Sequence, residues 1–219
     1  MLVAYYSKGC DSSALFAGLK IEKSDSYGQH LNRHQVIRLD VQRFLETKKD
    51  LDSFIAEIEN RLVAELSEEF SGCRNIGPDS RLKDVLDQIF IQTKKGFVFI
   101  IDEWDCVFRM AKEREDIQKD YLDFLRGLFK GAEYVELAYM TGILPIKKYG
   151  EHSAIYVFDE YSMIDAKRLG EYFGFTTEEV RERCQQYGVD SEQGDFSGVF
   201  ECGRRYGLER IDRRTYLCN

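Results

Sequence analysis

Residues 96–105 constrain the fold more than any other part of this sequence. They read Gly-Phe-Val-Phe-Ile-Ile-Asp-Glu-Trp-Asp. The five apolar residues from Phe97 to Ile101 favour β-structure and are too few for a helix, so they predict a strand buried on both faces. Two carboxylates, Asp102 and Glu103, follow at once. They are expected at the carboxyl end of the strand, where open α/β sheets bind ligands.

A buried strand followed by Asp-Glu is the Walker B pattern of nucleoside triphosphatases. The aspartate of this pattern holds Mg²⁺, and the adjacent glutamate can orient the water that attacks a γ-phosphate. Asp102 is therefore the candidate metal ligand, and Glu103 is a candidate catalytic residue. The alternative is a core strand that runs into an acidic, solvated turn, and this short stretch alone does not decide between the two.

Strands and helices alternate along the chain, which indicates a parallel sheet covered by helices. Strands are predicted at 35–41, 97–101 and 134–140. Helical spacing of apolar residues predicts helices over 51–70, from a cap at Asp79 or Ser80 through Phe90, and over 117–128 up to Gly131. A short helix over 11–16 precedes a polar loop to His34, and a capping box of Thr176 and Glu179 opens a helix to Tyr187, closed by Gly188. The helix over 117–128 supplies the crossover that makes strands 97–101 and 134–140 parallel neighbours.

Four more polar or aromatic residues are candidates for the site. Thr141 ends the strand expected beside Asp102, so it could contact the γ-phosphate or the attacking water as a catalytic sensor, or Thr-Gly could simply turn the chain. Asp105 is a helix cap or a second acid of the site, and the cap is favoured. Trp104 stacks on a base or closes the core. His152 has no acid at a spacing that suggests a nucleophilic triad.

Bulk properties exclude several classes of protein. The 219 residues are 43% hydrophobic, enough for one substantial core, and no apolar run is long enough to span a membrane. The six cysteines form no close pairs, which argues against a zinc site and favours reduced thiols in a cytoplasmic protein. The net charge of −8 argues against a general nucleic-acid-binding surface. We therefore expect neither a membrane nor a nucleic-acid partner.

A phosphate-binding loop is missing from the sequence. No Gly-x-x-x-x-Gly-Lys-Ser/Thr occurs, and the order and spacing of Ser7-Lys8-Gly9 do not match it. The loop's backbone amides and lysine normally neutralise the β- and γ-phosphates. No residue is therefore assigned to nucleotide binding itself.

Three blocks of sequence carry a family resemblance. They are residues 1–21, residues 97–105, and residues 140–180, where the last begins Met-Thr-Gly-Ile-Leu-Pro-Ile-Lys-Lys-Tyr-Gly. Together they resemble the bacterial predicted AAA-ATPase-like family, P-loop proteins often joined to a C-terminal nuclease-like domain. The likeness covers about residues 1–190, which implies a partial ATPase domain there and a divergent tail at 191–219. An asparagine usual in the third block is Tyr156 here.

The resemblance implies a fold and cofactors. The fold is α/β, a three-layer P-loop NTPase-like parallel sheet, and the cofactors are ATP and Mg²⁺. In relatives the first block is the helix after the Walker A loop, so the chain is expected to be a fragment that starts just past the Walker A lysine and lacks the Walker A strand. Its inner strands would then keep unpaired backbone groups.

Three functions compete at this point. The first is an ATP-binding, Mg²⁺-dependent ATPase-like domain with a nucleotide as its partner. The second is a catalytically dead remnant or a protein-interaction module with an unknown protein partner, and the missing phosphate loop favours inactivity for this chain. The third is a helicase fragment, because Asp-Glu-Trp-Asp fits Asp-Glu-x-Asp, but 219 residues leave no room for a second motor domain.

Overall fold

The computed structural model describes residues 1–46, 51–144, 157–161, 177–188 and 214–218. The chain divides into two compact units, residues 1–160 with 214–219, and residues 161–213. In the second unit the described helix is α9 (Thr177–Gln186), which is followed by Gly188 at φ 66°. The helix that the sequence predicts up to Tyr187 is therefore present, while Thr176 of its capping box lies outside the described residues.

Three parallel strands form the centre of the first unit. They are β1 (Gln35–Asp40), β2 (Phe97–Asp102) and β3 (Val135–Gly142), and β2 pairs with both of the others. The predicted parallel pairing of the second and third strands is confirmed. The register aligns Asp40 with Asp102 and Ile101 with Met140, so the carboxyl ends of all three strands meet at one edge.

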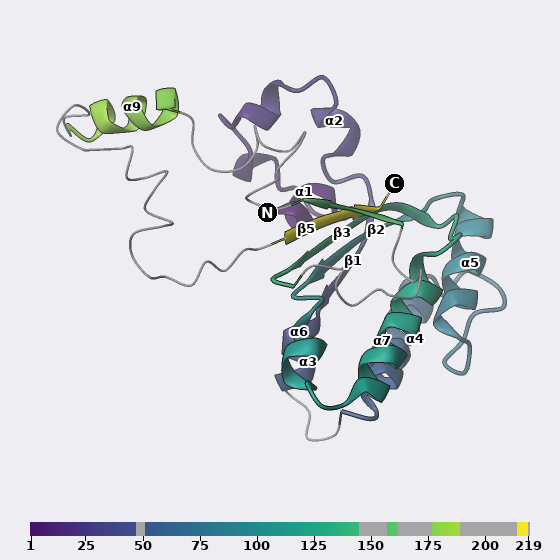
Figure 1. Cartoon of the computed structure of the whole chain (residues 1–219). Coiled ribbons are helices and arrows are strands. Elements are labelled where there is room, and N and C mark those ends of the chain that lie inside the picture. Colours follow the sequence, from purple (N-terminus) through teal and green to yellow (C-terminus); the bar gives the residue numbers. More distant parts are fainter. Residues whose placement is uncertain (47–50, 145–156, 162–176, 189–213, 219) are drawn as a thin grey trace. The chain divides into compact units, whose positions relative to one another are not determined.

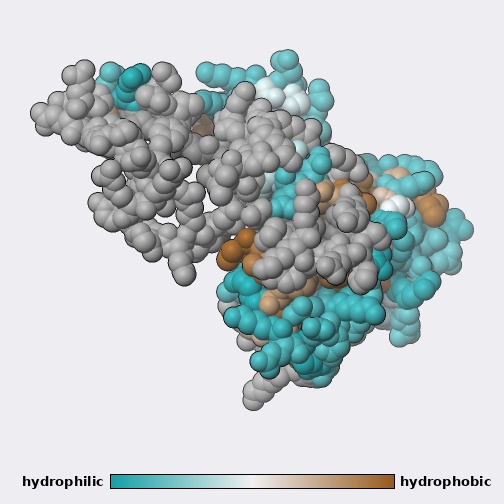
Figure 2. Space-filling view, in the orientation of Figure 1, coloured by the Kyte–Doolittle hydropathy of each residue, from teal (hydrophilic) through white to brown (hydrophobic). Residues whose placement is uncertain are grey.

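Helices cover one face of this sheet, as Figure 1 shows. They are α3 (Val41–Glu46), α4 (Phe54–Glu69), α5 (Leu82–Thr93), α6 (Cys106–Met110) and α7 (Glu115–Phe129). Their buried apolar side chains form one core with Leu39, Phe99 and Met140 of the strands. The solvent side of this helix layer, in the lower part of Figure 2, is mostly hydrophilic. The three long helices lie where they were predicted, but the N-cap residue of α5 is Arg81 and not Asp79 or Ser80. α3 and α6 were not predicted.

The N-terminal part of the unit contains α1 (Leu2–Tyr6), η1 (Ser13–Leu15), η2 (Lys20–Lys23) and α2 (Tyr27–His30). Figure 1 places α1 and α2 on the side of the sheet away from α3–α7. The helix predicted over 11–16 is only a 3₁₀ turn, and the predicted polar loop contains α2. Asn32 ties the segment together, because its side-chain amide donates to the carbonyl oxygens of Ala4 and Ser7 at 2.9 and 3.0 Å.

Two further strands extend the sheet beyond β3. The strand order is β1-β2-β3-β5-β4, with β4 at Phe158–Tyr161 and β5 at Arg214–Cys218. β5 pairs antiparallel with residues Tyr139 to Gly142 of β3. The expectation that inner strands keep unpaired backbone groups is therefore wrong for this stretch of β3. The predicted three-layer arrangement is supported only as an α/β fold with a three-stranded parallel sheet.

Within the described ranges, no helix has the length and apolar character needed to cross a membrane. Four of the cysteines, Cys10, Cys73, Cys106 and Cys184, are free thiols.

Candidate functional site

Asp102 and Thr141 meet at the carboxyl edge of the sheet. Asp102 is the last residue of β2, and the register of β3 places Thr141 beside it. The hydroxyl of Thr141 donates a hydrogen bond to Oδ1 of Asp102. Both side chains are partly exposed, and among the described residues Oδ2 of Asp102 accepts no hydrogen bond. The strand order thus brings together two of the three residues that the sequence singles out.

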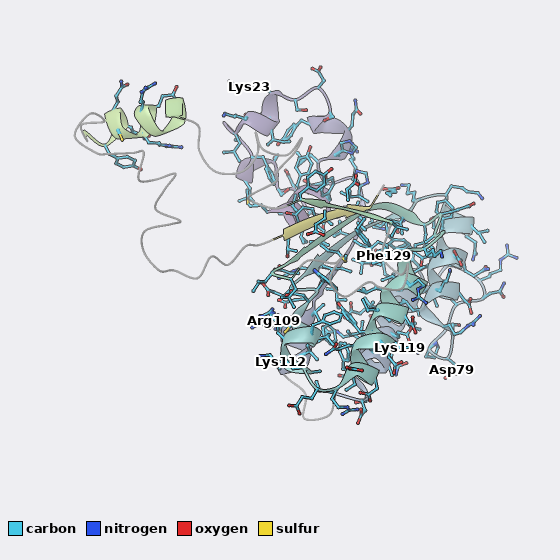
Figure 3. The ribbon with its side chains drawn as sticks, in the orientation of Figure 1. Lys23, Asp79, Arg109, Lys112, Lys119 and Phe129 are labelled. Atoms are coloured by element: carbon cyan, nitrogen blue, oxygen red, sulfur yellow. The ribbon has the colours of Figure 1, made fainter. Side chains whose placement is uncertain are left out.

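Glu103, the third of these residues, stands in an unusual backbone conformation. Its φ is +53°, in the left-handed region that residues other than glycine rarely occupy. Its carboxylate forms an ion pair with Arg109, and only 15% of its side chain is exposed. Arg109, labelled in Figure 3, comes from α6. Backbone strain of this kind clusters at functional sites, because the surrounding structure must hold it in place.

Asp105 connects Arg109 to the chain that follows β3. It is fully buried, and its Oδ2 lies 3.3 Å from Nε of Arg109. The same oxygen accepts a hydrogen bond of 3.1 Å from the backbone N–H of Leu144. Asp105 occupies the predicted N-cap position of α6, but its side chain makes no cap hydrogen bond. Its carboxylate instead joins residue 144 to α6, through the hydrogen bond from Leu144 and the ionic contact with Arg109.

Trp104 and Gly142 pack the turn against β3. Trp104 is fully buried in the core with an edge-on contact to Phe108, so of its two predicted roles the structure shows the packing role. Its backbone N–H donates to the carbonyl of Thr141 at 3.0 Å. A Cβ on Gly142 would lie 2.6 Å from Oδ1 of Asp105 and 2.6 Å from the Trp104 ring. The close approach of β3 to this turn therefore requires glycine at 142.

Asp40 is a further carboxylate at the same edge, and no role was predicted for it. It ends β1 and lies in register with Asp102. Its Oδ1 accepts a hydrogen bond of 3.1 Å from the backbone N–H of Arg43, so it caps the start of α3. Its Oδ2 lies 3.8 Å from Arg38. These contacts give Asp40 a structural explanation.

The residues present fit a magnesium ion that takes most of its ligands from substrate phosphates and only one or two from the protein. The described part of the chain contains no group of three or more His, Cys, Asp or Glu side chains arranged to hold a metal. Mg²⁺ commonly uses one or two carboxylates together with substrate phosphates, and Asp102 with its second oxygen available suits that role. The set does not fit a fully protein-enclosed metal site.

Lys8, the lysine of the Ser7-Lys8-Gly9 stretch, does not lie beside Asp102. Ser7 pairs with His34 just before β1, so Ser7 and Lys8 lie at the opposite end of the strand from Asp40 and Asp102. At about 3.3 Å per residue, the six residues of β1 separate the two ends by roughly 20 Å. Lys8 contacts Glu69 and Phe70 instead. His152, Ser153 and Tyr156 lie outside the described residues.

The chain was compared with known proteins. A family model described as predicted AAA-ATPase matches residues 1–150. Comparisons with curated proteins and with solved structures found no match. The matched range includes β1, β2, β3 and every residue of the site described above.

Proposed function

Because the chain belongs to the predicted AAA-ATPase family, we propose that the edge formed by Asp102, Glu103 and Thr141 is the Walker B half of a Mg²⁺-dependent nucleotide site. The observation that carries this proposal is the hydrogen bond from Thr141 to Asp102. It joins the ends of two adjacent parallel strands, at the edge where open α/β sheets bind ligands. The strained backbone of Glu103 beside them supports the same proposal.

Each residue has a distinct role in this proposal. Asp102 would bind the metal ion through Oδ2, while Thr141 fixes the orientation of the carboxylate through Oδ1. Glu103 would accept a hydrogen bond, and then a proton, from the water that attacks the γ-phosphate. Mg²⁺, when bound, would neutralise charge on the phosphates. Arg109 holds the Glu103 carboxylate through its ion pair, so Glu103 would act from a position that Arg109 defines.

A catalytically dead remnant or protein-interaction module is the second candidate function. The observation that favours it is the location of Lys8 at the opposite end of β1 from Asp102. The 219 residues contain no Gly-x-x-x-x-Gly-Lys-Ser/Thr loop to bind the phosphates. We therefore propose that this chain keeps the metal-binding half of the site but hydrolyses ATP negligibly by itself.

The test is to titrate ATP into the chain with and without Mg²⁺ and to follow binding by NMR, which detects weak affinities. Mg²⁺ should strengthen ATP binding in the wild type, and Asp102→Asn should remove this effect. Asp79→Asn is the matched control, because Asp79 is an exposed aspartate in the loop before α5. An unchanged Mg²⁺ effect in Asp102→Asn would overturn the assignment of Asp102 as metal ligand.

A further inference from the structure

A second feature, independent of the nucleotide site, lies at the outer edge of β1. β1 is the terminal strand of the sheet, with β2 on its other side. Just before β1, His34 pairs with Ser7: its N–H donates to the carbonyl of Tyr6, and its carbonyl accepts from Lys8, both at 2.8 Å. Gly9 follows at φ +85°, so the N-terminal segment turns after this single rung.

The pairing stops where β1 begins. Alternate residues of a strand direct their N–H and C=O groups to the same side, so the groups of Val36 and Arg38 follow those of His34 to the outer edge. No strand in the described ranges pairs with that edge. An open edge of this kind is a template for another extended chain.

A groove of about 270 Å³ runs along this open edge. The strand residues from Gln35 to Arg38 form one wall, and α4 forms the other. The apolar side chains of Leu62, Leu66 and Phe70 lie on the α4 side. The groove therefore offers unpaired backbone groups beside an apolar surface, the combination that binds an extended peptide by strand addition.

Charged side chains line both walls of the groove. Glu65 and Glu69 of α4 are well exposed, at 61% and 64% of their side-chain surface. Lys8 lies 3.5 Å from Glu69, and Arg61 lies 2.8 Å from Glu65. Arg38, 56% exposed, is on the strand wall. Side chains of an added strand alternate between the two faces of the sheet. Exposed ion pairs such as Arg61–Glu65 and Lys8–Glu69 contribute little stability, so basic side chains of a peptide can replace them. The complementary peptide therefore carries basic side chains toward Glu65 and Glu69 and acidic side chains toward Arg38.

We propose that this groove binds an extended segment of a partner protein, which adds to β1 as a further strand. The segment has an apolar residue for the α4 side, basic residues at the flanking positions on that same face, and acidic residues on the alternate positions. The peptide Thr-Lys-Glu-Val-Glu-Lys-Thr meets these requirements. Its valine faces Leu62, Leu66 and Phe70, and its two lysines face Glu65 and Glu69.

The experiment measures binding of this peptide, labelled with fluorescein, to the full chain by fluorescence anisotropy. Two matched peptides serve as comparisons. Thr-Glu-Lys-Val-Lys-Glu-Thr has the same composition but places its acids on the valine face. The other comparison keeps the first sequence and carries N-methyl groups on alternate residues, which block backbone pairing. Both should bind at least tenfold more weakly than the first peptide.

Protein variants test the groove itself. Glu65→Lys with Glu69→Lys should weaken the first peptide at least tenfold and strengthen the one with reversed charges. Asp79→Lys with Glu113→Lys makes the same change of charge at exposed sites away from the groove and should leave both affinities unchanged.

Three results would overturn the proposal. One is the absence of saturable binding by any of the peptides. Another is equal binding of the N-methylated peptide, which would show a charged surface without strand pairing. The last is a dimer of the chain, seen by sedimentation at the assay concentration, that the peptide does not dissociate, because the edge would then bind a second copy.

Discussion

The hydroxyl of Thr141 at the end of β3 donates a hydrogen bond to the carboxylate of Asp102 at the end of β2. The contact joins residues 39 positions apart in the sequence, and it depends on the parallel register of the two strands. It fixes one oxygen of the aspartate, while the other accepts no hydrogen bond from the described residues.

Thr141→Val should remove this hydrogen bond with little change in side-chain shape. Because Asp102 is partly exposed, its freed oxygen can bind water, and the free energy of unfolding should fall by about 1 kcal/mol. Thr141→Ser keeps the hydroxyl and should cost less. Urea unfolding of the three proteins measures both effects. A loss of stability in Thr141→Ser with none in Thr141→Val would show that the Thr141 methyl group, and not the hydrogen bond, is what matters.

Gly142→Ala and Gly127→Ala should change stability in opposite directions. The Cβ at 142 would lie 2.6 Å from Asp105 and from Trp104, both fully buried, and such overpacking costs about 1–3 kcal/mol. A Cβ at 127, in α7, meets nothing within 4 Å. Alanine there should stabilise the helix by about 0.5–1 kcal/mol. Thermal unfolding of both variants shows whether each change raises or lowers stability. Unchanged stability in Gly142→Ala would contradict the tight packing of β3 on this turn.

Tyr121→Phe and Tyr134→Phe form a second matched pair. Both rings are fully buried. The hydroxyl of Tyr134 donates to the carbonyl of Leu128 at 2.6 Å, whereas the hydroxyl of Tyr121 has no hydrogen-bond partner among the described residues. Tyr134→Phe should therefore lower the free energy of unfolding by about 1 kcal/mol, whereas Tyr121→Phe should leave it unchanged or raise it. Urea unfolding at neutral pH distinguishes them. A clear loss in Tyr121→Phe would reveal a partner for its hydroxyl.

The same two tyrosines predict a loss of stability in alkali. Burial raises the pKa of Tyr121, with the nearby Asp105 and Cys106 as further causes, and burial with Asp87 raises the pKa of Tyr134. The fold thus favours the neutral phenols, and this contribution is complete below the unfolded pKa of about 10. It is lost as the pH rises above that value. The urea midpoint should fall above about pH 10, and less steeply in the double Phe variant. Identical alkaline slopes would assign the effect to other groups.

Binding of Mg-ATP to the 219-residue chain should be weak, with a dissociation constant in the millimolar range. Phosphates near Asp102 would lack the amides and the lysine of a Gly-x-x-x-x-Gly-Lys-Ser/Thr loop, and each lost charge-assisted hydrogen bond is worth roughly 1.5–3 kcal/mol. The net charge of −8 also opposes them. Calorimetric titration beside Asp102→Ala measures this affinity. Micromolar binding that disappears in the variant would show that the chain contains a phosphate-binding loop of another kind.

The sequence predicted the central strands and long helices because each carries a strong local signal. The apolar run before Asp102 predicted β2, and Ile117, Tyr121 and Leu125 at helical spacing predicted α7. The crossover rule then predicted the parallel pairing of β2 and β3 and the meeting of Asp102 with Thr141. This much of the candidate site followed from the order of elements alone.

Other parts of the fold carry no such signal. α3 and α6 have six and five residues, too few to show a period. Because α6 was not predicted, the spacing of four between Asp105 and Arg109 was not recognised as a helical ion pair. β5 lies in a stretch that differs from the family resemblance, and its pairing with β3 is a tertiary contact. The conformation of Glu103 has no sequence signature, since glutamate is not a residue typical of positive φ.

The positive φ of Glu103 means that the backbone and the chemistry of this site favour different amino acids. Glycine would relax the turn at position 103, and asparagine would be the next best choice, but neither offers a carboxylate. A population of variants selected only for resistance to heat would therefore drift toward these residues at 103 and lose the proposed base without losing the fold. Stability and the proposed catalytic role of Glu103 therefore favour different residues at one position of the chain, so selection for stability alone would not preserve that role.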